Sequence, residues 1–155
     1  MAENYEARSN LMWASSLAIN GLLTYGKETN WSVHPMEHEL SAYYDITHGV
    51  GLAILTPAWM EYVLDDNTVD KFVEYAINVW DLDRSKEKYD LAKEAINKTR
   101  EFFISLDIPT TLREVGINEE KLEEMANQSV RRRKTIGNFK PLNAEDVLNI
   151  YKAAL

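Results

Sequence analysis

Cysteine is absent from this 155-residue chain, which excludes a disulfide framework and any thiolate metal site. Cations are also scarce, because 17 Lys and Arg residues stand against 25 Asp and Glu residues and give a formal net charge of -8. That charge argues against nucleic acid as a partner, since binding to a phosphate backbone requires a positive surface. With no disulfide chemistry and a polar N-terminal segment, the sequence is compatible with a cytoplasmic location.

Long apolar runs are missing as well. The most apolar stretch, Gly49–Met60, contains Pro57 and is too short to span a bilayer, so we expect no membrane association. An apolar content of 45% is typical of a globular fold. The length allows one domain with a sizeable core but not two ordinary ones, so we expect residues 1–155 to form a single domain.

No segment alternates between apolar and polar residues with a period of two. Residues 69–80 and 91–106 instead follow the i, i+3, i+4, i+7 spacing of amphipathic helices. The sequence therefore predicts an all-α bundle of about seven or eight helices. Expected boundary signals are Asn4 and Gly26 around a first helix over 5–25, Ser32 before a second, Thr47 before a third that is kinked at Pro57, a Thr111–Glu114 capping box, and N-caps at Asn118 and Asn143.

All three histidines of the chain lie between Trp31 and His48, at positions 34, 38 and 48. Neutral imidazole is a common ligand of zinc and iron, and residues spaced i, i+4 share one face of a helix. We expect His34 and His48 to converge from two consecutive helices. Gly49 and Gly51 follow directly, which indicates that another group approaches the backbone closely there. Trp31 and Tyr43 are candidates for a nearby substrate pocket.

Two metal-based hypotheses compete for these residues. His34-Pro35-Met36-Glu37-His38 matches H-x-x-E-H, a zinc-hydrolase signature in which both histidines bind zinc and the glutamate is the general base. The alternative is a site built on His34 and His48, completed by acidic ligands from elsewhere.

The longer context distinguishes the two. The segments MWASSLAINGLL, WSVHPMEHELSAYYDITHGVGLAILTPAWM, DKFVEYAINVWD, TREFFISLDIPTTLREVGI and IGNFKPLNAEDVLNIYKAAL resemble the C-terminal helical domain of iron-containing alcohol dehydrogenases. The resemblance is strongest to the NAD(P)H-dependent butanol dehydrogenases and covers essentially the whole chain. Its most specific element is H-x3-H-x9-H followed by Gly-Val-Gly. It implies the helical fold of the dehydroquinate synthase-like α domain.

The resemblance also implies residue roles. His34 and His48 correspond to ligands of a catalytic Fe(II), or of Zn(II) in some members of the family. His38 corresponds to a catalytic histidine beside the nicotinamide and the substrate, where it takes part in proton transfer. In the full-length enzyme, hydride then passes between NAD(P)H and a small aldehyde or alcohol.

Two features of that family are not found in the sequence. There is no glycine-rich dinucleotide-binding turn, and no Asp-x3-His pair that would supply the other metal ligands. We therefore expect a fragment, incomplete at its N-terminus and without its nucleotide-binding domain, that binds metal weakly and has no dehydrogenase activity alone. The first and third helices are apolar on nearly all sides, so we also expect either self-association or a missing nucleotide-binding half as a partner. A non-catalytic helical assembly module is the alternative.

Overall fold

The computed structural model describes residues 4–155, and its regular secondary structure in that range consists of helices and one isolated antiparallel bridge between Ile136 and Leu142. The helices are α1 (Tyr5–Ile19), η1 (Leu22–Thr24), α2 (Val33–Tyr44), α3 (His48–Val63), α4 (Val69–Trp80), α5 (Lys88–Ser105), η2 (Arg113–Val115), α6 (Leu122–Ser129) and α7 (Ala144–Ala153). The predicted all-α class is confirmed. In the described residues, no helix is both long and apolar enough to cross a membrane.

The chain divides into two compact units, Met1–Asn30 and Trp31–Leu155. The first unit contains α1 and η1. Asn4 caps α1 as expected, because its side chain accepts a hydrogen bond from the backbone N–H of Ala7 at 3.0 Å. The prediction that this helix continues to residue 25 is wrong. Gly21 adopts a left-handed conformation with φ of 89°, which ends the helix and starts a short 3-10 turn.

Helix α1 has no buried residue, although its composition is typical of a buried helix. Trp13 is 67% exposed, and Leu11 and Met12 are exposed to a similar extent. The sequence predicts exposed apolar faces on the first and third helices, and the large apolar side chains of α1 are exposed. The third helix differs from that expectation, because α3 buries seven residues against other helices of its own unit.

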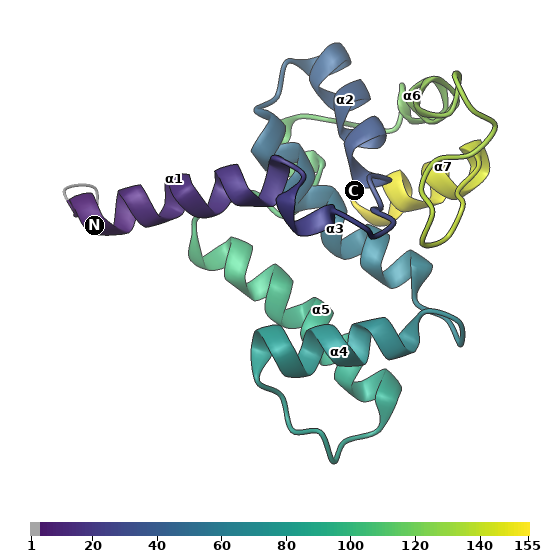
Figure 1. Cartoon of the computed structure of the whole chain (residues 1–155). Coiled ribbons are helices and arrows are strands. Elements are labelled where there is room, and N and C mark those ends of the chain that lie inside the picture. Colours follow the sequence, from purple (N-terminus) through teal and green to yellow (C-terminus); the bar gives the residue numbers. More distant parts are fainter. Residues whose placement is uncertain (1–3) are drawn as a thin grey trace. The chain divides into compact units, whose positions relative to one another are not determined.

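The second unit is built around α3, which packs against α2, α5 and α7 (Figure 1). Helix α4 packs against α5, and α6 packs against α7 and α2. Apolar side chains from these elements form the core; the largest fully buried ones are Tyr151, Met36, Leu40, Leu55, Leu91, Ile96, Leu112, Ile117, Leu122, Met125, Leu142 and Ile150. Helix α3 continues through Pro57, which is buried within it. The core therefore fixes α2 and α3 against each other.

Side-chain caps determine several helix ends. Asn143 accepts hydrogen bonds from the N–H groups of Glu145 and Asp146, and Asp146 completes a capping box at the start of α7. Thr111 and Glu114 are bonded reciprocally around η2. The predicted cap at Asn118 is wrong: its side chain accepts from Glu120 N–H in a local turn, and α6 begins only at Leu122.

Candidate metal centre

The histidine cluster is created by the tight connection between α2 and α3. Helix α2 ends at Tyr44, and the next residue, Asp45, takes a left-handed conformation with φ of 53°. Helix α3 begins at His48, so three residues connect the two helices. This turn reverses the chain and places the first residue of α3 beside the first two turns of α2. His34 and His38 lie one turn apart on α2, so both face the space where His48 enters.

The three imidazole rings form a compact triangle. Their centroids are separated by 5.3 Å for His34 and His48, 5.5 Å for His38 and His48, and 6.1 Å for His34 and His38. The Trp31 ring packs edge-on against His34 with centroids 4.5 Å apart. The predicted convergence of the histidines is therefore present in the fold. Tyr43, a predicted pocket residue, donates a hydrogen bond to Glu124 of α6.

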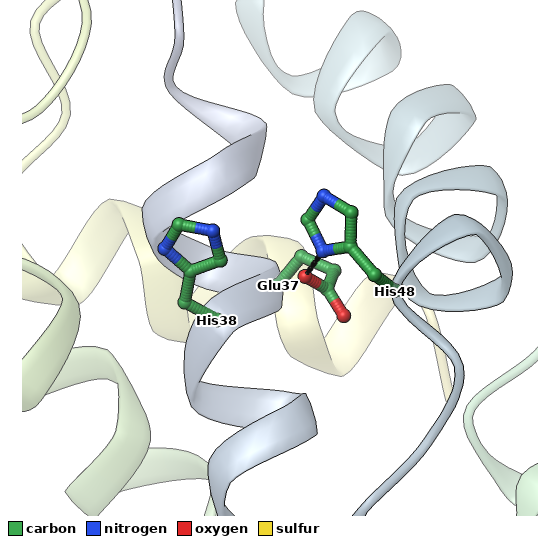
Figure 2. A group of neighbouring side chains, drawn as sticks. All are labelled: Glu37, His38 and His48. Carbon is green, nitrogen blue, oxygen red and sulfur yellow. Dashed lines mark hydrogen bonds and ion pairs between the residues drawn. The ribbon is translucent and has the colours of Figure 1, made fainter.

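Glu37 lies beside the His48 ring of this triangle. Its side chain is fully buried, and one carboxylate oxygen, Oε2, is hydrogen-bonded to His48 Nδ1 (Figure 2). The other oxygen, Oε1, accepts a hydrogen bond from the Ser41 hydroxyl at 2.5 Å. Burying a carboxylate is costly unless it is paired, and these two contacts supply the pairing.

Gly51 provides the space that Glu37 occupies. A Cβ atom at position 51 would lie 2.7 Å from Glu37 Cγ and 2.8 Å from Oε1, closer than side-chain atoms normally approach. The sequence-based expectation of a close approach at the two glycines is thus correct for Gly51. It is not met at Gly49, where such an atom would meet nothing within 4 Å.

The electrostatics of the cluster favour the neutral form of His34. Burial lowers the pKa of His34 below its ordinary value of 6.5, and the neighbouring His48 and His38 lower this pKa further. His34 is therefore uncharged at neutral pH, which is the form of the ring that binds metal ions.

Within the described residues, Glu37, His38 and His48 offer ligand atoms that all lie within 4.8 Å of one another (Figure 2). This set differs from the predicted ligand pair His34 and His48 in two ways, because it contains His38 in place of His34 and it adds Glu37. Imidazoles combined with carboxylate oxygens form a donor set that suits Fe(II) and Zn(II). The residues present thus fit such an ion, but the grouping alone does not rank His34 against His38.

The sequence predicted a different role for Glu37 from the one that its position in the fold supports. The H-x-x-E-H pattern identified Glu37 only as the general base of a hydrolase, whereas its carboxylate contacts His48 across the helix connection. The available signal was Gly51, which indicated a close approach to the backbone but did not identify Glu37 as the approaching side chain. Their separation in sequence hides that contact until the two helices are placed together.

The fold and the site together define a helical domain that carries a histidine cluster at a helix junction, the form expected of a metal-binding domain. Comparison with known proteins gives the family: residues 1–155 match the model described as the C-terminal part of the Fe-containing alcohol dehydrogenase family. The chain belongs to this family.

Its relatives include NADH-dependent butanol dehydrogenase A of Clostridium acetobutylicum, which is 68% identical over 97% of the chain and 39% of the relative. NADPH-dependent aldehyde reductase YqhD of Escherichia coli is 38% identical over 75% of the chain and 30% of its own length. The crystal structure of NADH-dependent butanol dehydrogenase A from Thermotoga maritima superposes with a TM-score of 0.89 at 33% identity, covering 98% of the chain and 40% of the relative. The chain therefore spans 30% to 40% of the length of these relatives.

Proposed function

We propose that these 155 residues are the metal-binding helical part of an NAD(P)H-dependent alcohol dehydrogenase that interconverts small aldehydes and alcohols, as butanol dehydrogenases do. The convergence of His34, His38 and His48 at one helix junction carries this proposal. It is supported by the 68% identity to a protein named as a butanol dehydrogenase.

In this proposal, His34 and His48 hold Fe(II) or Zn(II). The bound ion supplies a Lewis acid for the oxygen of the aldehyde or alcohol. Holding an ion requires uncharged imidazoles, and the lowered pKa of His34 provides one. The rings come from two different helices that share one core, so the packing of α2 on α3 sets their separation.

His38 has a different role in the proposal. It is exposed, whereas His34 is partly buried, and so it is the histidine more accessible to substrate and to the nicotinamide. An imidazole in that position can transfer a proton to or from the substrate oxygen. The hydride itself comes from the nicotinamide cofactor.

The relatives are longer than this chain, and the proposal assigns nicotinamide binding and the remaining metal ligands to the part of them that residues 1–155 do not match. Residues 1–155 would then act as one domain of that larger enzyme. The isolated polypeptide is accordingly expected to show no NADH oxidation with butyraldehyde and added Fe(II) or Zn(II). Clear turnover would contradict this division of roles.

A chimera tests the function directly. These residues would replace the matching 39% of the Clostridium butanol dehydrogenase A, and NADH oxidation with butyraldehyde would be measured. We expect an active chimera. His34→Ala and His48→Ala should both lower its metal content, whereas His38→Ala should keep the metal and lower kcat by about 10²-fold or more, the usual contribution of a proton-transfer group.

Two results would contradict the proposal. One is a folded, metal-loaded chimera without turnover. The other is a His38→Ala chimera with unchanged kcat, which would remove the proposed role of that side chain.

The hydrolase hypothesis is disfavoured by the position of Glu37. A general base must reach a metal-bound water, but this carboxylate is fully buried and is shared between Ser41 and His48. Its geometry instead supports a role in holding His48.

A further inference from the structure

We propose that Glu37 is a positioning residue that fixes the tautomer and the ring direction of His48, with Ser41 and Gly51 holding its carboxylate in place. This inference deepens the proposed function and rests on the assignment of His48 as a metal ligand. It adds a residue to the centre that binds neither metal nor substrate.

A hydrogen bond joins the Glu37 carboxylate to the His48 ring. We assign the proton of the bond between Glu37 Oε2 and His48 Nδ1 to Nδ1, because a carboxylate accepts hydrogen bonds and the imidazole N–H donates them. A neutral imidazole carries one N–H, and the lone pair of His48 is then on Nε2. That nitrogen lies on the opposite side of the ring from Glu37 and is the one left to bind an ion (Figure 2).

The Glu37 carboxylate is restrained by its buried surroundings. Glu37 has no exposed surface, and its second oxygen is held by the Ser41 hydroxyl at 2.5 Å. Gly51 faces Glu37 so closely that a Cβ atom would overlap Cγ and Oε1 at 2.7 and 2.8 Å. The carboxylate therefore has a defined position, and it transmits that position to the His48 ring.

Fixing the His48 ring should strengthen metal binding. His48 is half-exposed, with a side-chain exposure of 47%, and an exposed imidazole otherwise rotates and exchanges tautomers. A carboxylate behind a ligating histidine fixes both properties, and losing such a partner typically weakens metal binding by about 10- to 100-fold. The same chemistry is expected of Glu37 here.

The test measures the tautomer in the metal-free 155-residue chain. Histidine is labelled with ¹⁵N, and two-bond ¹H–¹⁵N correlation spectra at about pH 8, above the ordinary pKa of histidine, report which ring nitrogen carries the proton. We expect His48 to be protonated at Nδ1. Glu37→Met keeps the volume but removes the acceptor, and should move His48 toward the Nε2–H form; Glu37→Gln keeps an acceptor oxygen and should retain Nδ1–H.

Glu39→Met is the matched control, because it makes the same change on the same helix at a partly exposed position. It should leave the His48 spectrum unchanged. In parallel, Zn(II) titrations should give a Kd that is about 10- to 100-fold higher for Glu37→Met than for Glu39→Met.

The inference is overturned if His48 in the unsubstituted chain carries its proton on Nε2, a result that needs no variant to fold. It is also overturned if Glu37→Met leaves the tautomer at Nδ1–H. Because the spectra are recorded without metal, they decide the role of Glu37 alone, whereas a failure of the chain to bind Zn(II) at His34 and His48 would count against the proposed function.

Discussion

At the scale of single residues, the centre depends on a small residue and a buried acid on neighbouring helices. Gly51 leaves the volume that the Glu37 side chain fills, and the acid in turn contacts His48. A larger side chain at position 51 should therefore displace Glu37 and, through it, alter the position of His48 without contacting the histidine directly. Gly49 is only two residues away but faces open space.

This contrast gives a matched pair of substitutions. Gly49→Ala should stabilise the chain by up to about 1 kcal/mol, because alanine favours a helix over glycine. Gly51→Ala should destabilise it by about 1 to 2 kcal/mol, because the added methyl group overlaps a buried side chain that has no room to move. Urea unfolding of the two variants and the parent chain measures both free energies. Equal effects of the two substitutions would show that Glu37 is not confined by Gly51.

The histidines of the centre were predictable from the sequence, but the contacts that they make were not. The grouping of positions 34, 38 and 48 was visible in the sequence, because i, i+4 spacing and a short connection are local features. The bond from Glu37 to His48 was not, because it depends on how α2 packs against α3. The choice of His34 or His38 as partner of His48 depends in the same way on ring orientations that spacing does not specify.

At the scale of secondary structure, capping side chains explain where prediction succeeded and where it failed. Asn4 and Asn143 were predicted as caps, and both accept hydrogen bonds from helix N–H groups. Asn118 has the same residue type, but its side chain closes a local turn before α6. Asparagine favours both arrangements, so the residue alone does not determine which one forms. The early end of α1 at Gly21 has a similar cause, since an isolated glycine within an apolar pattern is ambiguous.

The cap of α7 is worth testing because that helix covers the core. Asn143→Ala removes the acceptor for two N–H groups and breaks the capping box. We expect a loss of about 1 kcal/mol and, for a chain of this size, a fall in Tm of roughly 2 to 4 °C. Asn118→Ala is the control and should cost less, because its bond lies outside a helix. Thermal unfolding followed by circular dichroism compares them, and similar losses would argue against the capping box as a determinant of α7.

At the scale of the whole molecule, the first unit presents apolar side chains to solvent. Large apolar residues in it that are more than 60% exposed are Tyr5, Leu11, Met12, Trp13, Ile19, Leu22, Leu23 and Tyr25. A cluster of this kind is larger than a monomer usually exposes. We propose that in the isolated chain a second copy covers it.

Light scattering and sedimentation velocity over a range of concentrations test this proposal. We expect a shift toward dimer with increasing concentration, which Leu11→Gln combined with Trp13→Gln should abolish. Val79→Gln, a substitution at an exposed apolar residue of α4, should leave the association unchanged. A single monomeric species at high concentration would rule out self-association through this surface.

In the proposed function, His34 and His48 bind the metal, and His38 lies beside it without being a ligand. A Zn(II) titration of the ¹⁵N-histidine-labelled chain, followed at each imidazole nitrogen, measures this directly. The account predicts that one ring nitrogen of His34 and Nε2 of His48 shift together with a single Kd, while the nitrogens of His38 shift much less. If His38 and His48 shift together and His34 does not, the ion is bound by the Glu37, His38 and His48 group instead, and the assignment is contradicted.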